Sequence, residues 1–207
     1  MTFRTKTITL LMTGTIALGA FSAVPASAAP AQKISYNQVA TNPIAERAQA
    51  AMNARGTEAF GPELDALAVA VASKLGIDSA AVQAAWRAAD GEHQVALVAA
   101  LSQVGVPYRR NTSKPGVGFD CSGLTTYAWG QAGFSLYRQS GVQIRNAAKV
   151  TADSAQPGDL VYYPGHVMMW LGVGSAIVHS PFTGRNVEVS FVSKRRVSRV
   201  LYGDPTA

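Results

Sequence analysis

Cysteine is nearly absent from this sequence: Cys121 is the only one in 207 residues. A single thiol cannot form a disulfide within the chain, which excludes the class of small disulfide-stabilised domains. Charged residues are also scarce at 14%, but the hydrophobic share of 48% excludes an intrinsically disordered chain. Beyond residue 28, no apolar run approaches the ~18 residues that a membrane span needs.

Metal-binding and nucleotide-binding motifs are missing as well. The cysteine and the three histidines include no closely spaced pair of ligands, so a zinc site is not expected. No phosphate loop or dinucleotide fingerprint occurs, and the basic residues are not interleaved with aromatic ones as on a nucleic-acid surface. We therefore expect no metal, no cofactor and no nucleic-acid partner. The net charge of +6 suits an anionic partner such as a cell wall only in a general way.

The N-terminus carries the pattern of an export signal. Arg4 and Lys6 precede an apolar stretch over residues 8–24, and a run of small residues, Ala-Ser-Ala, ends at residue 28. This pattern predicts a signal peptide over residues 1–28 and a protein secreted to the extracellular space, the cell wall or the periplasm. A retained membrane helix is the alternative, but the proline and the small residues after the apolar stretch favour cleavage.

Residues 29–90 are expected to form a helical N-terminal segment. After a leader without clear periodicity, the spacing predicts helices over 44–55, 62–75 and 79–89. The second helix has apolar residues three and four positions apart, at Leu64, Leu67, Ala68 and Val71. Such a stripe is usually core, so we favour a brace packed on the next domain. The alternatives are an inhibitory element or a surface, over residues 43–90, for a regulatory protein partner.

Residues 91–207 are expected to form one α+β domain. Helices are predicted over 92–104 and 120–131, with a loop over 109–118 between them. Beyond Pro157, β-branched and aromatic residues predict strands over 160–163, 166–173, 176–179, 187–192 and 197–202. Helices that precede strands in this way indicate helices packed on one face of an antiparallel sheet.

Cys121 lies where a glycine-rich loop leads into the second of these helices. A cysteine in the first helical turn faces unpaired backbone N–H groups and the positive end of the helix dipole, which favour the thiolate. Asp120 is a candidate N-cap, Gly123 allows another chain to approach closely, and the N–H of Cys121 is a candidate oxyanion-hole donor. A buried structural cysteine is the alternative, but Asp, Ser and Gly neighbours make a poor core. We therefore expect a catalytic nucleophile.

Two of the three histidines are candidates for its base. His166 begins an apolar strand, and its imidazole is expected to take the thiol proton and later give it to the leaving amine. His179 closes the next strand and, if the two strands form a hairpin, can hold His166 in the required tautomer. A hydrogen-bonded histidine at a strand end is the alternative, and a one-residue change of register would turn the ring away. His93, at a helix start beside Glu92, is expected on the surface.

Four segments, taken in order, resemble the NlpC-type cell-wall peptidases, which have a papain-like fold. They are GVPY at 105–108, FDCSGL at 119–124, PGDLV at 157–161 and GHV at 165–167. The segment RQSGVQ at 138–143 is also similar to the family's Arg, Ser and Gln segment between helix and sheet. The resemblance covers about residues 91–202. It implies a nucleophile helix packed on an antiparallel sheet.

The resemblance implies a cysteine endopeptidase that cuts peptidoglycan stem peptides, typically between D-glutamate and a diamino acid. It implies Cys121, His166 and His179 as catalytic residues, and the substrate-binding residues Tyr108, Asp120 and Ser122. The sequence departs from the family's pattern in three places, one of which is the bulky run Met168-Met169-Trp170 after His-Val, where glycine is frequent. His166 and His179 are 13 residues apart, one more than is common. Arg109 and Arg110 replace a Gly-Gly loop, which predicts either selection of an acidic peptide or a solvated loop.

The residues leave three functions open. An endopeptidase, monomeric and without a cofactor, is favoured. A wall-binding or regulatory module that has lost the chemistry is the second, although the cysteine and both strand histidines are retained. An acyltransferase or thioesterase is the third, because it would form the same thioester intermediate with the same dyad.

Overall fold

A computed structural model describes residues 42–207 of the chain. The predicted signal peptide and leader lie outside the described residues. None of the helices in residues 42–207 combines the length and the apolar content that crossing a membrane requires.

Three helices form the N-terminal part of the described chain: α1 (Pro43–Asn53), α2 (Phe60–Leu75) and α3 (Ser79–Ala88). The side chain of Asn42 caps α1 by accepting hydrogen bonds from the next backbone N–H groups, and Asp78 caps α3 in the same way. Gly76, with a φ of 66°, ends α2 in the left-handed conformation. Helix α2 begins at Phe60, two residues before the predicted start, because Pro62 is tolerated in the first turn.

Three further helices follow: α4 (Gly91–Leu101), α5 (Cys121–Gln131) and α6 (Ser140–Asn146). Helices α4 and α5 were predicted from their periodicity, whereas α6 is too short to show one. The segment predicted as a loop before α5 contains a small antiparallel hairpin of β1 (Ser113–Lys114) and β2 (Gly118–Phe119).

A six-stranded antiparallel sheet forms the rest of the fold, with the order β3-β8-β4-β5-β6-β7. The helices and this sheet confirm the α+β class. The strand predicted over 197–202 is wrong at its start, because residues Val197–Arg199 form a short 3₁₀ helix and the strand begins at Leu201. The strands are β3 (Ala148–Val150), β4 (Leu160–Tyr163), β5 (His166–Trp170), β6 (Ala176–His179), β7 (Glu188–Phe191) and β8 (Leu201–Asp204).

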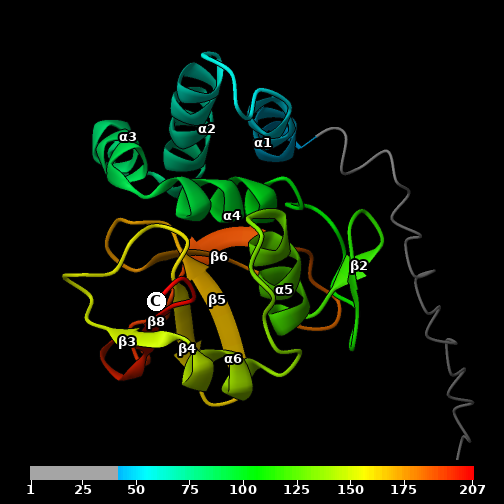
Figure 1. Cartoon of the computed structure of the whole chain (residues 1–207). Coiled ribbons are helices and arrows are strands. Elements are labelled where there is room, and N and C mark those ends of the chain that lie inside the picture. Colours follow the sequence, from blue (N-terminus) through cyan, green and yellow to red (C-terminus); the bar gives the residue numbers. More distant parts are fainter. Residues whose placement is uncertain (1–41) are drawn as a thin grey trace, which may run out of the picture. The chain divides into compact units, whose positions relative to one another are not determined.

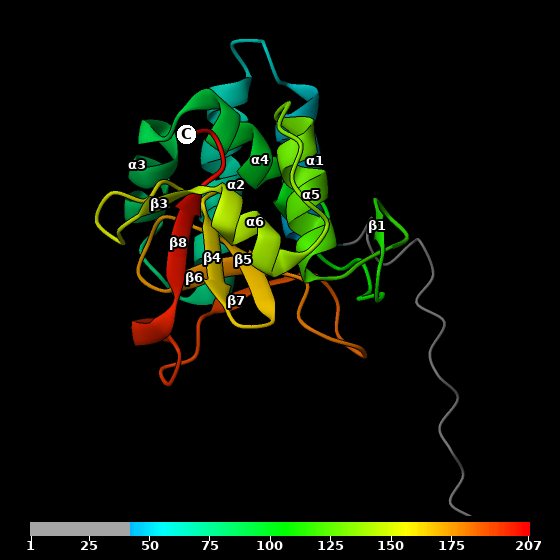
Figure 2. The same cartoon turned by 60° about the horizontal axis from the view of Figure 1, so that its bottom comes forward.

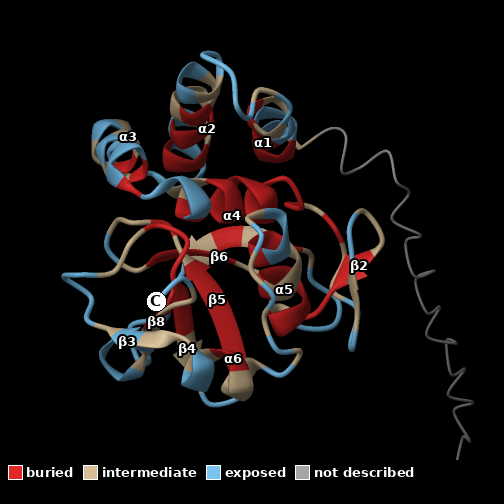
Figure 3. Cartoon of the chain, viewed as in Figure 1, coloured by how far each residue is buried: buried red, intermediate tan, exposed pale blue. Residues whose placement is uncertain are grey.

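The two faces of the sheet have different neighbours. Helix α5 packs along β5, and α4 crosses the end of the sheet near β6 (Figures 1 and 2). Val167 and Met169 of β5 join the main core with Leu124 of α5, while Met168 and Ile177 belong to a smaller cluster on the other face. Figure 3 shows the resulting burial of β5 and α4. Strand alternation therefore assigns His166, two residues before Met168, to the face of the smaller cluster.

Helices α1–α3 share the main core with α4, α5 and the sheet. Leu64, Leu67, Val71 and Trp86 are all buried, as the amphipathic pattern predicts. Trp86 also donates a 2.8 Å hydrogen bond from Nε1 to the carbonyl oxygen of Leu171, which follows β5. The N-terminal helices are therefore packed on the rest of the fold as the brace hypothesis predicts, and an inhibitory or partner-binding role stays a prediction.

Candidate active site

Cys121 is the first residue of α5 and is partly exposed. Asp120 caps the helix, because its Oδ1 accepts a 2.8 Å hydrogen bond from the N–H of Gly123. This confirms the predicted N-cap. The N–H of Cys121 lies in the first helical turn, where backbone donors have no partner within the helix, so it is free to face a developing oxyanion.

The loop before α5 lies against the first turn of the helix. The N–H of Asp120 donates to the carbonyl oxygen of Thr112 at 3.0 Å, and a Cβ on Gly123 would lie 2.1 Å from that same oxygen. The predicted close approach at Gly123 is therefore confirmed, and only glycine fits there.

Arg138 holds both polar neighbours of the cysteine. It donates from Nη2 to Oδ2 of Asp120 at 2.7 Å and from Nη1 to Oγ of Ser122 at 2.9 Å. Asp120 and Ser122 are buried, at 7% and 6% exposure. Their contacts position α5, and direct contact with a substrate stays a prediction for both.

A buried hydrogen bond ties the nucleophile segment to the histidine segment. Ser180 donates from Oγ to the carbonyl oxygen of Phe119 at 2.7 Å. Phe119 lies two residues before Cys121, and Ser180 directly follows His179. This bond links two parts of the chain 61 residues apart and fixes the residue after His179 against the residue two positions before Cys121.

His166 and His179 are hydrogen-bonded to each other. Strands β5 and β6 pair with Met169 opposite Val178, and this register places the two histidines diagonally on the same face of the sheet. Nε2 of His166 lies 2.9 Å from Nδ1 of His179. The hairpin predicted from the sequence is confirmed. Nδ1 of His166 is the ring nitrogen left to serve as a base.

Two residues of β7 complete this row and were not identified from the sequence. Oγ of Ser190 lies 3.1 Å from Nε2 of His179, and Oε1 of Glu188 lies 3.5 Å from the same nitrogen. Arg185 donates to both oxygens of Glu188 at 2.6 Å. The only sequence signal for these residues was a polar alternation in a predicted strand, and that pattern does not show which strand lies beside it.

Burial keeps both histidines neutral. It lowers the pKa of His166 to about 3, and the positive charges of His179 and Arg196 add to this effect. Burial and Arg185 lower the pKa of His179 to about 4. A neutral imidazole keeps a ring lone pair that can accept a proton.

Two tyrosines lie within the electrostatic reach of Cys121. Burial raises the pKa of Tyr108, and the nearby groups of Asp120 and Cys121 add to this increase. Burial also raises the pKa of Tyr163, where Arg196 opposes the shift and Cys121 adds to it. Tyr163 lies opposite His166 in the β4–β5 pairing, with ring centroids 5.3 Å apart. Tyr163 therefore packs beside His166, a neighbour that strand alternation alone does not predict.

A cavity of about 200 Å³ lies beside the histidine pair. Its lining includes Tyr163, both histidines, Phe182 and Arg196. The guanidinium of Arg196 stacks on Tyr163, 4.4 Å from the ring centroid. This cation was missed by the sequence analysis, because it is one of several basic residues in an exposed loop.

Arg109, the cation predicted near the cleft, packs its side chain along the loop before α5. It is exposed, and its aliphatic carbons cover Gly118, where a Cβ would lie 2.4 Å from Cδ of Arg109. Its stem therefore packs on β2, and contact with a substrate stays a prediction.

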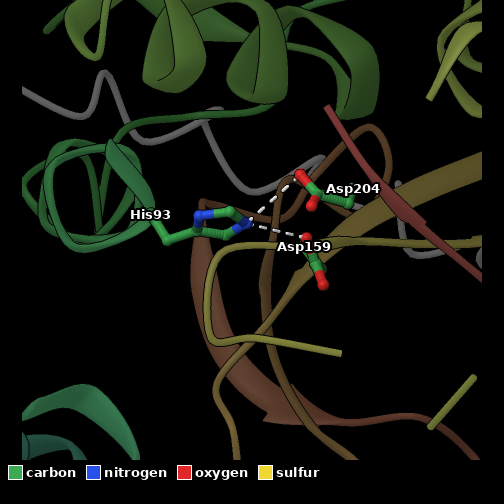
Figure 4. Close-up of side chains that lie close together, drawn as sticks. All are labelled: His93, Asp159 and Asp204. Carbon is green, nitrogen blue, oxygen red and sulfur yellow. Dashed lines mark hydrogen bonds and ion pairs between the residues drawn. The ribbon is translucent and has the colours of Figure 1, made fainter. Parts of the chain in front are cut away.

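His93 is buried, which corrects the expected surface position. Nε2 lies 3.0 Å from Oδ1 of Asp159 and 3.4 Å from Oδ1 of Asp204, so the ring joins α4 to the sheet (Figure 4). Burial lowers the pKa of His93, but the two carboxylates outweigh it and the net shift is upward. Within residues 42–207 this group alone has the ligand atoms for a metal ion, within 4.8 Å of one another. Both carboxylates have further hydrogen bonds, since Asp159 accepts from the N–H of Gln156 and Asp204 from the N–H of Thr206, whereas the buried Nδ1 of His93 has no partner among residues 42–207.

Known proteins resemble this chain over the same region. The model of the NlpC/P60 family matches residues 105–204. A protein of Corynebacterium glutamicum named a probable endopeptidase is 34% identical over 167 residues, which cover 78% of this chain and 78% of that protein. The peptidoglycan endopeptidase RipA of Mycolicibacterium smegmatis is 36% identical over 106 residues, which cover 44% of this chain and 21% of RipA.

A solved structure also resembles this one. It is that of a hypothetical invasion protein of Mycobacterium tuberculosis, with 26% identity and a TM-score of 0.49 over 55% of this chain and 62% of that chain.

Proposed function

The chain belongs to the NlpC/P60 family, and from its membership we propose that it is a cysteine endopeptidase of peptidoglycan with a Cys121–His166–His179 site. The 2.9 Å contact between the two histidines is the observation that carries this proposal. It occupies Nε2 of His166 and leaves Nδ1 to act on a thiol at the start of α5. The names of the relatives support the endopeptidase activity.

The proposed reaction is acyl transfer to the thiol and then to water. The sulfur of Cys121 attacks the scissile carbonyl carbon while Nδ1 of His166 takes the thiol proton. The carbonyl oxygen becomes an oxyanion, which the N–H of Cys121 and the N-terminus of α5 stabilise. The C–N bond then breaks, and His166 gives its proton to the leaving amine. Water, deprotonated by the same nitrogen, hydrolyses the thioester and restores the thiol.

The proposed substrate is the stem peptide, cut between D-glutamate and the diamino acid, as the family resemblance implies. The cations near the site support a peptide that carries carboxylates. Arg196 lines the cavity beside the histidines, and Arg109 and Arg110 lie exposed on the loop that follows Tyr108. We also propose that the protein is exported, with residues 1–28 removed, because its substrate lies outside the membrane.

Cleavage of a synthetic stem peptide by the purified protein tests the activity. The wild type is expected to release a fragment ending in D-glutamate, identified by its mass, and Cys121→Ala is expected to release none while unfolding at a similar temperature. Cleavage by Cys121→Ala would overturn the cysteine mechanism. Release of a fragment cut at another bond would overturn the proposed specificity.

A further inference from the structure

The hydrogen bond between the two histidines can be made in two ways. A neutral imidazole carries one N–H and one lone pair. Either Nε2–H of His166 donates to Nδ1 of His179, or Nδ1–H of His179 donates to Nε2 of His166. In the first arrangement Nδ1 of His166 has the lone pair that can take the thiol proton. In the second arrangement Nδ1 of His166 carries the hydrogen, so this nitrogen cannot take the thiol proton.

The far nitrogen of His179 decides between these arrangements. An ionised carboxylate can only accept, so Glu188, 3.5 Å away, favours a hydrogen on Nε2 of His179. That leaves a lone pair on Nδ1 of His179, which selects the productive arrangement at His166. The hydroxyl of Ser190 can donate or accept, so its 3.1 Å contact holds the ring without choosing a tautomer.

Contacts with neighbouring residues hold the side chain of Glu188 in position. It lies directly opposite His179 in the β6–β7 pairing. Arg185 donates to both of its oxygens at 2.6 Å, which orients the carboxylate. Its side chain is 26% exposed, so its charge is only partly screened by water.

We propose that Glu188 is a positioning residue that fixes the tautomers of both histidines, so that His166 presents an unprotonated Nδ1 to Cys121. The role rests on the proposed cysteine peptidase function. When Nδ1 takes the thiol proton, His166 becomes an imidazolium, and its Nε2–H still donates to His179. The negative charge of Glu188 stabilises the new positive charge on His166, whereas the positive charges of Arg185 and Arg196 disfavour it. No proton moves beyond His166.

Nitrogen-15 NMR of the labelled protein reports the tautomers without any need for turnover. The wild type at pH 7 is expected to carry the hydrogen on Nε2 of both histidines. In Glu188→Gln, Arg185 still needs an acceptor and draws the amide oxygen, which turns the NH₂ group toward His179. His179 and then His166 are expected to change to the Nδ1–H tautomer. For the same variant we expect kcat to fall about 10- to 100-fold with little change in KM.

Two variants serve as controls. Glu188→Asp keeps an acceptor and is expected to retain the wild-type tautomers and recover part of kcat. Ser190→Ala removes a contact to the same nitrogen but leaves the carboxylate, and is expected to keep the wild-type tautomers. An Nδ1–H tautomer of His179 in the wild type, or unchanged tautomers in a folded Glu188→Gln, would overturn the inference. A wild type with the expected tautomers that cuts no stem peptide would instead refute the proposed function and leave the tautomer assignment intact.

Discussion

Ser180 donates a buried 2.7 Å hydrogen bond to the carbonyl oxygen of Phe119. Ser180 directly follows His179, and Phe119 directly precedes Asp120, the N-cap of α5. The same carbonyl accepts from the N–H of Arg109 at 2.8 Å, so three segments converge on one oxygen. Ser180 thus anchors the segment after His179 to the segment that leads into Cys121.

Ser180→Ala tests this anchor. The variant loses a buried hydrogen bond, and we expect the free energy of unfolding to fall by about 1–3 kcal/mol. We also expect kcat/KM to fall at a temperature where the variant is fully folded, because Cys121 and His179 lose their shared anchor. Thermal unfolding and peptide cleavage on the same sample measure both. A destabilised variant with the wild-type rate would show that the bond contributes to stability alone.

Two glycines of α5 form a matched pair for substitution. At Gly123 a Cβ would lie 2.1 Å from the backbone oxygen of Thr112, whereas at Gly130 nothing lies within 4 Å. We expect Gly123→Ala to lower the free energy of unfolding by about 1–3 kcal/mol or more and to impair cleavage. Gly130→Ala is expected to raise that free energy by about 0.5–1 kcal/mol and leave cleavage unchanged. Chemical denaturation of both variants checks the contrast, and equal effects would contradict the described approach of the loop.

The sequence was informative where local patterns carry the structure. Helices α4 and α5, the nucleophile and the pair of strand histidines follow from periodicity, capping and residue type. Glu188 and Ser190 could not be found in this way, because strand alternation does not specify the neighbouring strand or its register. His93 was misplaced because a polar residue beside Glu92 indicates a surface. Its partner Asp159 is 66 residues away in the chain.

The buried ion-pair group of His93 predicts a pH-dependent contribution to stability. The carboxylates of Asp159 and Asp204 outweigh burial and raise the pKa of His93 in the folded state. The stabilisation is therefore fully present below the unfolded value of about 6.5 and is lost as the pH rises through the folded pKa. Removing one partner of such a group costs about 3–5 kcal/mol.

His93→Gln is therefore expected to be least stable relative to the wild type at acidic pH. Urea denaturation of both proteins across pH measures the difference in the free energy of unfolding. A difference that grows toward alkaline pH would contradict the assignment of a charged His93.

Arg196 is expected to influence the acid limb of the pH–rate profile. Burial and His179 lower the pKa of His166, and the charge of Arg196 adds to this. Because a protonated His166 cannot act as a base, activity is lost as the pH falls through this pKa. Arg196→Gln removes a positive charge, so the pKa rises and the acid limb of kcat/KM moves to higher pH by a fraction of a unit.

Arg195→Gln is the matched control for Arg196. It removes the same charge from the neighbouring position, and Arg195 does not line the cavity. We expect a smaller shift of the acid limb for this variant. Equal shifts would mean that the charge of the whole loop, and not the position of Arg196, sets the effect.

Rapid quenching of the reaction with a stem peptide, followed by mass analysis of the digested protein, tests the thioester chemistry most directly. We predict that the N-terminal part of the peptide is recovered on Cys121 through its D-glutamyl carbonyl, and that Cys121→Ala carries no adduct and forms no product. Product formation by Cys121→Ala, which has no thiol to carry an adduct, would contradict the account.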